Sequence, residues 1–319
     1  MHCRIILLVV SLLLTLPPIS CAATITTFHG YSNCIVLSNA TTRIVLGLEG
    51  GRVLEYSLHG ENALYLEEAE AGRPHQPGRP ANMTAGRFDI GPEKVIPPHP
   101  KLWSGTWTGE ITGERSARLT SPRDEQLGTQ LIRTFSLAET GSDLACTQTI
   151  VNIGQQPTEW CHWSRTFARG NGICLIPLTA PSRFPNSYVM YEDGDRINIR
   201  PSDPNIRHRD GFLEITGVPR HPKLGMDSTA GWFAYLMKNN LLFIKRYATY
   251  AERVYNEAAG LTVSIWYPED RRVELEPIGP RERLSPGQSA SFTENWRLVS
   301  FPFPSAGDVN LDRVRQAAQ

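Results

Sequence analysis

The composition of the chain does not by itself identify a partner. Its 319 residues carry 32 basic and 32 acidic side chains, so there is no basic surplus that would indicate nucleic-acid binding. It has only six cysteines, with no CxxC and no Cys/His spacing typical of a zinc site. It also lacks a Gly-rich phosphate loop and a Gly-x-Ser-x-Gly elbow. These absences argue against nucleic-acid, zinc, dinucleotide and serine-hydrolase chemistry.

Long apolar runs are also scarce, and the only one lies at the N-terminus. Residues 5–16 are almost entirely apolar, and two prolines and several small residues follow them. Because a membrane-spanning helix needs about 20 apolar residues, the segment predicts a signal peptide over residues 1–23, cleaved near Ala23. A lipid anchor at Cys21 is the alternative. We expect a secreted or periplasmic chain with no membrane span, in which residues 24–319 form one domain.

Four cysteines lie beyond this segment: Cys34, Cys146, Cys161 and Cys174. In an oxidising compartment four thiols allow three pairings, and the sequence does not choose among them. Cys161 and Cys174 are the favoured pair. The alternative is four buried free thiols, because a core of this size needs no cross-links.

Most of the remaining chain reads as strands. Short β-branched and aromatic runs recur between turn residues, to which 26 glycines and 24 prolines contribute. We expect strands over residues 43–48, 52–58, 106–112, 129–137, 144–153, 158–167, 232–236, 242–247, 262–267, 272–276 and 290–299. Helical periodicity is best at residues 309–318. This pattern predicts an all-β fold, a large antiparallel sandwich or barrel.

Two irregular stretches interrupt this pattern. Residues 68–100 contain seven prolines, and residues 201–223 are rich in Pro, Asp, Arg and His. Irregular segments of this length in a compact domain are usually functional or disordered. We expect both to border a binding cleft. Trp103, which follows the first stretch, is the tryptophan expected to face a ligand, because an indole can stack on the C–H face of a sugar.

The expected strand over residues 158–167 holds the first candidate for chemistry. Alternation places His162 and Ser164 on one face and Trp163 and Arg165 on the other. A histidine beside an indole can act as a general acid. The alternative is a histidine packed in the core.

The expected strand over residues 272–276 holds the second candidate. Glu274 and Glu276 share one face, Leu275 lies on the other, and Pro277 is expected to end the strand. A carboxylate fixed at a strand end is a suitable general base. The alternative is an ordinary polar strand face.

Two further charged residues lie in strand patterns that are largely apolar. Arg165 is either the partner of a buried carboxylate or a clamp for an acidic sugar. Glu294 lies on a mostly apolar face and therefore needs a cationic partner. We expect the two to pair with each other.

The order of several motifs resembles that of the galactose mutarotase, or aldose 1-epimerase, superfamily. Residues 151–157 (Val-Asn-Ile-Gly-Gln-Gln-Pro) lead into residues 160–163 (Trp-Cys-His-Trp), which resembles the strand, turn and histidine-bearing strand of that family. Residues 275–277 (Leu-Glu-Pro) and 284–287 (Leu-Ser-Pro-Gly) are similar to its Leu-Glu-Pro element and following turn. The resemblance spans nearly the whole chain after the predicted signal peptide.

The resemblance implies a large β-supersandwich with a concave face that holds a sugar or glycan, with no cofactor, no metal and no nucleic acid. It implies that His162 protonates the ring oxygen and that Glu276 takes the proton from the anomeric hydroxyl. Such a pair is what hemiacetal ring opening requires.

The remaining site residues are chosen on their chemistry and their place in the sequence. Asp89 and Asp227 are candidates to orient sugar hydroxyls, and His99 is the only histidine in the region of the family's second histidine. Asp89, His99, Trp103 and Arg165 form the expected substrate-binding set. Two other functions stay open on this scaffold: a non-catalytic carbohydrate-binding module, and a polysaccharide hydrolase or lyase.

Overall fold

The structure is a computed structural model that describes residues 22–73, 84–193 and 196–319. Nearly all of the predicted signal peptide, including Cys21, lies outside these residues, so export and lipid anchoring stay predictions. Within the described ranges, none of the helices has the length and apolar character that crossing a membrane requires.

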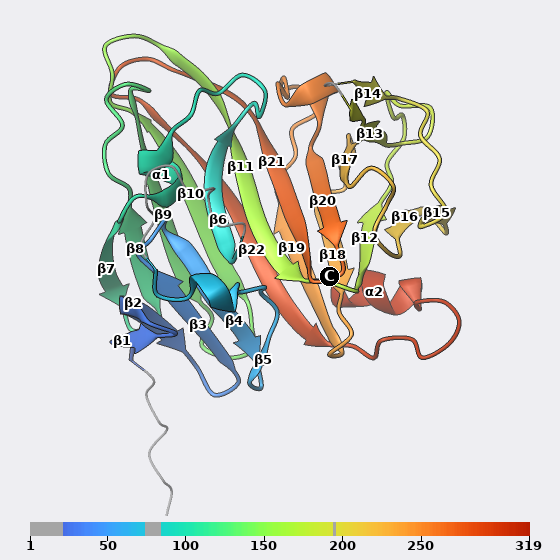
Figure 1. The fold of residues 1–319 in the computed structure, drawn as a ribbon, viewed down its shortest axis with the longest axis horizontal. Coiled ribbons are helices and arrows are strands. Elements are labelled where there is room, and N and C mark those ends of the chain that lie inside the picture. The colour runs from blue at the N-terminus through green and yellow to red at the C-terminus, as the bar shows by residue number, and fades with distance from the viewer. Residues whose placement is uncertain (1–21, 74–83, 194–195) are drawn as a thin grey trace, which may run out of the picture.

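The described chain forms two sheets that face each other, and their strands pair antiparallel (Figure 1). The first sheet has 12 strands. In spatial order they are β1 (Thr24–Phe28), β2 (Tyr31–Ser38), β3 (Thr42–Gly47), β4 (Arg52–Leu58), β6 (Gly86–Gly91), β11 (Thr158–Arg169), β21 (Arg272–Leu284), β20 (Val263–Glu269), β17 (Lys223–Met226), β13 (Val189–Tyr191) and β14 (Ile197–Asn198), with β5 (Glu61–Asn62) beside β4.

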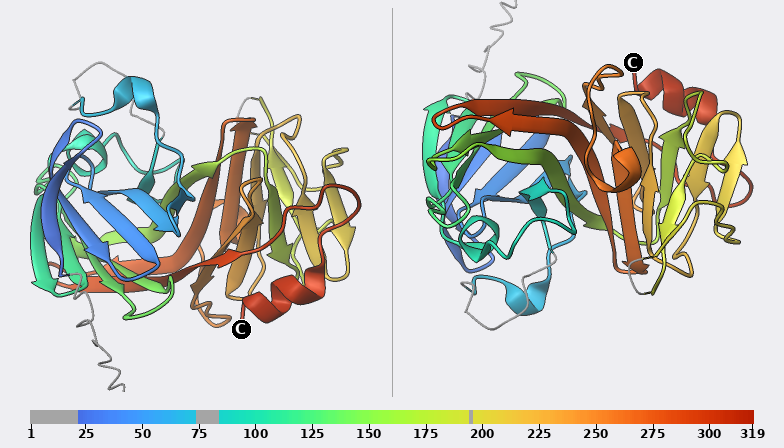
Figure 2. Two further views of the ribbon diagram at one scale, coloured as in Figure 1. Left: turned by 90° about the horizontal axis from the view of Figure 1, so that it is seen from below. Right: turned by 90° about the horizontal axis from the view of Figure 1, so that it is seen from above.

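The second sheet has 10 strands. In spatial order they are β15 (Ile206–Arg209), β16 (Phe212–Ile215), β12 (Ile173–Pro177), β18 (Trp232–Leu236), β19 (Leu241–Tyr247), β22 (Ser289–Ser300), β10 (Leu144–Asn152), β9 (Thr129–Leu137), β8 (Ser116–Thr120) and β7 (Thr108–Gly113). The long strands run between a half built from early residues and a half built mainly from residues after 170 (Figure 2).

Each strand predicted from the sequence is present, so the all-β antiparallel sandwich is confirmed. Helix α2 (Leu311–Ala317) confirms the helical pattern at the C-terminus. Its first turn is capped by the Asn310 side chain, which accepts a hydrogen bond from the Arg313 N–H. Leu311 and Val314 of α2 pack on the outer face of the second sheet.

The structure has a strand, β6, inside the first irregular stretch, where the sequence predicts none. Its two glycines and two charged residues leave little apolar pattern to recognise. β6 is held in place by antiparallel pairing with β11, which lies in the middle of the first sheet. The paired residues run from Cys161↔Gly91 to Thr166↔Gly86. The short helix α1 (Pro100–Ser104) then lies close to β6.

The core lies between the sheets and follows the alternation of each strand. Leu275 of β21 and Phe88 of β6 belong to one buried cluster with Phe135 and Trp296 of the second sheet. Residues of opposite parity on β6, β11 and β21 therefore point away from the second sheet. This outer face of the first sheet carries the polar residues described below.

The strand β21 continues past Pro277, where the sequence predicts its end. The Ile278 N–H donates to the Thr262 carbonyl, and pairing with β11 continues to Thr158↔Leu284. The register shifts by one residue between Cys161 and Trp163, opposite this part of β21. A bulge of this kind accommodates prolines within a sheet.

The four cysteines in the described chain are free and buried, so the predicted Cys161–Cys174 pair is wrong. Cys161 lies on β11 of the first sheet and Cys174 on β12 of the second. Cys174 packs in the main core cluster, whereas Cys161 packs in a separate cluster with Trp163. The two strands follow each other in sequence but diverge into different sheets.

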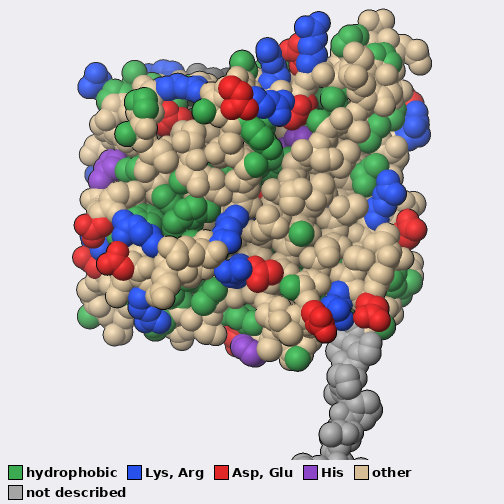
Figure 3. All heavy atoms as spheres, turned by 180° about the vertical axis from the view of Figure 1, so that it is seen from behind, with side chains coloured by type: hydrophobic (Ala, Val, Ile, Leu, Met, Phe, Trp, Pro, Cys, Tyr) green, Lys and Arg blue, Asp and Glu red, His purple; other side chains and the backbone are tan. Residues whose placement is uncertain are grey.

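The surface agrees with the balanced composition. On the face opposite to the view of Figure 1, basic and acidic side chains are interspersed (Figure 3). Charge-based recognition on this face therefore has to come from a local arrangement of side chains.

Candidate ligand cleft on the outer face of the first sheet

His162 lies in the core, where it cannot reach a ligand on the outer face. Its side chain is fully buried, and its ring stacks between Phe88 and Phe292 at centroid distances of 5.9 and 5.7 Å. Its Nε2 lies 3.1 Å from the Ala290 carbonyl oxygen. Burial lowers the pKa of His162 to about 4, so the ring is neutral at physiological pH. The predicted general acid is therefore a structural histidine, the alternative considered above.

Strand register explains why His162 and Glu276 do not meet. The pair Thr166↔Leu275 places these two residues on the same face of the first sheet. His162 has the parity of Thr166 and faces the core with Leu275, whereas Glu276 faces outward. The acid–base pair expected from the sequence is thus divided between the two faces of one sheet.

Arg165 occupies the centre of the outer face. Its Nε and Nη2 donate to the two carboxylate oxygens of Glu274 at 2.6 and 3.3 Å, and its Nη1 lies 3.7 Å from Asp89 Oδ2. The charges of Glu274 and Glu276 outweigh burial and raise the pKa of Arg165, so it stays cationic. The predicted Arg165–Glu294 pair is therefore wrong. Glu294 lies in the core, 3.0 Å from Lys245 Nζ.

Glu276 is held by Lys223 and by an indole. Lys223 Nζ lies 2.8 and 2.7 Å from its two oxygens, and Trp163 Nε1 donates to one of them at 2.8 Å. The Glu276 side chain is fully buried. Both oxygens of the predicted base are therefore occupied by partners that hold it in its ionised form.

The pKa values of the two neighbouring carboxylates of β21, Glu274 and Glu276, are shifted in opposite directions. Burial would raise the pKa of Glu276, but the charges of Lys223 and Arg165 keep it below its ordinary value. Burial raises the pKa of Glu274 above its ordinary value, and the charge of Glu276 adds to that effect. Two ionisable groups this close titrate as a pair.

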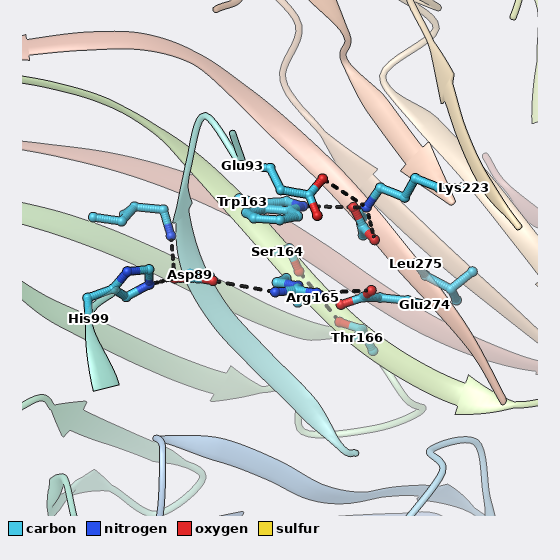
Figure 4. Close-up of polar contacts among 12 residues, drawn as sticks. Asp89, Glu93, His99, Trp163, Ser164, Arg165, Thr166, Lys223, Glu274 and Leu275 are labelled. Carbon is cyan, nitrogen blue, oxygen red and sulfur yellow. Dashed lines mark hydrogen bonds and ion pairs between the residues drawn. The ribbon is translucent and has the colours of Figure 1, made fainter. Parts of the chain in front are cut away.

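Asp89 and His99 form a second ion pair at the edge of the same face (Figure 4). His99 Nε2 lies 2.7 Å from Asp89 Oδ1, and His99 Nδ1 lies 2.7 Å from the Pro97 carbonyl oxygen. Burial would lower the pKa of His99, but its hydrogen bond to Asp89 and the Asp89 charge raise it to about 9. Both ring nitrogens therefore donate, and His99 anchors the loop after β6 rather than offering a free nitrogen.

Replacing Asp89 by asparagine tests this assignment. Because the imidazolium would lose its counterion, the pKa of His99 is expected to fall from about 9 to its ordinary value of 6.5 or below. An NMR titration of the histidine ring protons measures it, and a His99→Gln protein identifies the signal. An unchanged pKa in the Asp89→Asn protein would show that another group stabilises the charge.

Trp103 lies against the same face but is buried rather than open to a ligand. Two guanidinium groups lie over its ring, those of Arg87 at 4.4 Å and Arg165 at 4.7 Å from the ring centroid. Arg87 Nη1 also donates to the Trp103 carbonyl oxygen at 2.7 Å. Trp103 therefore contacts Arg165 through its ring. The expectation that it faces a ligand is wrong.

A cleft of about 300 Å³ opens beside these residues, and side chains from β11, β13, β17, β20, β21 and the loop after β6 line it. The lining residues are Glu93, Lys94, Arg165, Tyr191, Lys223, Trp266 and Glu274. Its volume is at the lower end of the range for small-molecule sites, about 300–1,000 Å³. The first irregular stretch borders it, as predicted, whereas the second contributes only its last residue, Lys223.

Five of the six predicted site residues lie on or against the outer face, but only Arg165 lines the cleft, and the sequence misses its other lining residues. Trp266 could have been found, because it alternates with the core residues Ile265 and Tyr267 and must face outward. Lys223 and Glu93 had no comparable signal, since each lies beside a turn. Among the residues that the structure describes, no group of His, Cys, Asp or Glu is arranged to hold a metal ion.

Solved structures with the same architecture come from several bacteria. A galactose mutarotase-like protein from Lactobacillus casei ATCC 334 aligns with a TM-score of 0.59 at 10% identity, over 83% of this chain and all of that one. A galactose mutarotase-like protein from Clostridium acetobutylicum aligns with a TM-score of 0.55 at 10% identity, over 88% and 98%. A galactose mutarotase related enzyme from Lactobacillus acidophilus gives 0.57 at 10% identity, over 84% and 98%.

By sequence comparison, no protein-family model and no curated protein matches the chain. At 10% identity, structural similarity establishes the fold and not the activity. The chain has the galactose mutarotase-like β-sandwich fold that its motifs predict.

Proposed function

We propose that this chain binds a carbohydrate in the cleft on the outer face of its first sheet. The observation that carries the proposal is the cleft itself, in which an indole lies beside fixed ionic groups on a sandwich of the mutarotase type. Carbohydrates need both kinds of surface: an aromatic face for their C–H groups and charged or polar groups for their hydroxyls.

The cleft residues divide these tasks. Trp266 is half-buried on β20 and supplies the apolar wall. Arg165 and Lys223 supply donors for hydroxyl groups, and each is held in place by a buried carboxylate. Such preorganisation favours binding because little side-chain entropy remains to be lost.

Binding without turnover is the function that this geometry supports best. Anomer interconversion through His162 and Glu276 would need both side chains beside one sugar, and they occupy opposite faces of the sheet. Polysaccharide cleavage would need two carboxylates flanking a bond across a cleft. Glu274 and Glu276 are neighbours on one strand, and Glu276 is fully buried.

Replacing Trp266 by alanine is expected to weaken sugar binding about 5- to 30-fold, since a stacking contact contributes about 1–2 kcal/mol. A glycan array selects the sugar, and isothermal titration calorimetry measures the affinity. Trp232→Ala is the matched control, because Trp232 is also a half-buried indole but lies on the second sheet. Equal loss in both variants, or none in Trp266→Ala, would place binding elsewhere.

Polarimetry with the same sugar separates binding from turnover. The expected result is no acceleration of anomer interconversion, and no release of reducing ends from a polysaccharide panel. A rate above that of the buffer would require an acid and a base other than the pair predicted from the sequence.

A further inference from the structure

The two cations of the cleft are more exposed than the carboxylates with which they pair. The side chains of Arg165 and Lys223 are 12% and 13% exposed, whereas those of their partners Glu274 and Glu276 are 1% and 0% exposed. Each ion pair therefore turns its cation toward the cleft and its carboxylate toward the sheet. A ligand in the cleft meets the positive end of two oriented pairs.

Both cations lie near the same indole. Arg165 and Lys223 both lie over the Trp163 ring, at 4.3 and 5.1 Å from its centroid. Their carboxylate partners fix them from below through the hydrogen bonds described above. The charges of Glu274 and Glu276 offset the repulsion between the two cations.

Glu93 supplies a third carboxylate at the edge of the cleft. Its Oε2 lies 3.7 Å from Lys223 Nζ, which is an ion-pair contact longer than a hydrogen bond. Its side chain is 32% exposed, and its backbone N–H donates to Glu257 Oε2 at 2.7 Å. Figure 4 shows the Glu93 carboxylate directed toward Lys223 from the loop after β6. The Glu93 carboxylate is more exposed and less closely paired than Glu274 and Glu276, so a ligand can displace it.

We infer that the carbohydrate taken by this cleft carries a negative charge, and that its anionic group replaces the Glu93 carboxylate beside Lys223 and Arg165. The inference rests on the proposed function, because it assigns the charge of the sugar that binds there. A carboxylate or a sulfate ester on the sugar would serve, since a guanidinium and an ammonium both donate to such oxygens. Glu93 then acts as an internal competitor that neutral sugars do not have to displace.

Calorimetry on the full folded chain tests the inference with sugars that differ only in charge. The panel contains galacturonate, its methyl ester and galactose 6-sulfate, with the corresponding glucose series. Galacturonate or glucuronate is expected to bind at least about tenfold more tightly than its neutral ester, and more weakly as salt is raised. Tighter binding of the sulfate than of the uronate would identify a sulfated ligand instead, within the same inference.

The decisive variant is Glu93→Gln, which removes the competing charge from a partly exposed position and leaves the buried pairs intact. The ratio of its affinity for the acidic sugar to its affinity for the neutral ester is expected to rise about five- to tenfold. Glu125→Gln is the matched control, because Glu125 is an exposed surface carboxylate outside the cleft lining. Variants of Arg165 or Lys223 are less informative, since each would leave a buried carboxylate unpaired.

The outcomes separate the two proposals. If neutral and acidic sugars bind equally well and Glu93→Gln changes neither, the inference is overturned while carbohydrate binding stands. If no sugar binds and Trp266→Ala has nothing to weaken, both the proposed function and the inference are overturned.

Discussion

Replacing Lys245 by methionine is expected to lower the free energy of unfolding by about 3–5 kcal/mol. Lys245 is fully buried between the sheets, with its Nζ 3.0 Å from Glu294 Oε2. It also donates to Ser164, Thr166 and the Leu275 carbonyl of the first sheet, at 3.1, 2.7 and 3.2 Å. Its removal leaves the Glu294 carboxylate without its counterion in a low-dielectric core.

Urea unfolding followed by circular dichroism measures this effect. Adding Glu294→Gln to the Lys245→Met chain is expected to recover about 1–3 kcal/mol, because the uncompensated charge disappears while an acceptor remains for Trp296. Lys238→Met serves as the control, since Lys238 is an exposed lysine in the same hairpin and should change stability by less than about 0.5 kcal/mol. Equal stability of Lys245→Met and the parent would mean that the pair contributes nothing.

Acidification is expected to destabilise the protein through His162. In the unfolded chain a histidine binds a proton near pH 6.5, whereas the folded protein resists protonation of His162 until about pH 4. Between these values the unfolded state binds more protons, so the free energy of unfolding falls as pH falls. The contribution of His162 is complete above pH 6.5, and about 3 kcal/mol of it is lost by pH 4.

The variant His162→Gln isolates this contribution. Glutamine is neutral at every pH and can still donate toward the Ala290 carbonyl that His162 contacts at 3.1 Å. The unfolding free energy of the parent minus that of the variant should be constant above pH 7. It should fall toward pH 4, because only the parent has a histidine at this position. Sugar binding at pH 7 should be the same in both proteins. Loss of sugar binding in a folded His162→Gln chain would show that His162 contributes to the binding site.

The contrast between His162 and Arg165 shows how far the sequence could be interpreted. Alternation correctly assigns them to opposite faces of β11, and it correctly separates Glu276 from Leu275 on β21. Alternation does not show which face of β11 lies on the same side of the sheet as a given face of β21. That depends on register, and the register Thr166↔Leu275 joins segments more than 100 residues apart.

The cleft was predictable only in part for the same reason. Asp89, Arg165 and Glu276 could be selected as charged residues in otherwise apolar or turn-rich surroundings, and the structure places them on one face. Lys223 was not predictable, because nothing in its neighbourhood indicates that β17 pairs with β20. Glu93 depends on the path of a loop that the Asp89–His99 pair fixes from outside the strand.

By itself the amino-acid sequence determined the class of fold, the position of the principal strands and the face on which each side chain lies within its own strand. These features follow from local periodicity and turn chemistry, which act over a few residues. Only the tertiary structure decided which faces meet, and so placed the histidine in the core and two cations over one indole. Pairing between distant strands depends on burying the whole apolar face at once, and no local pattern records it.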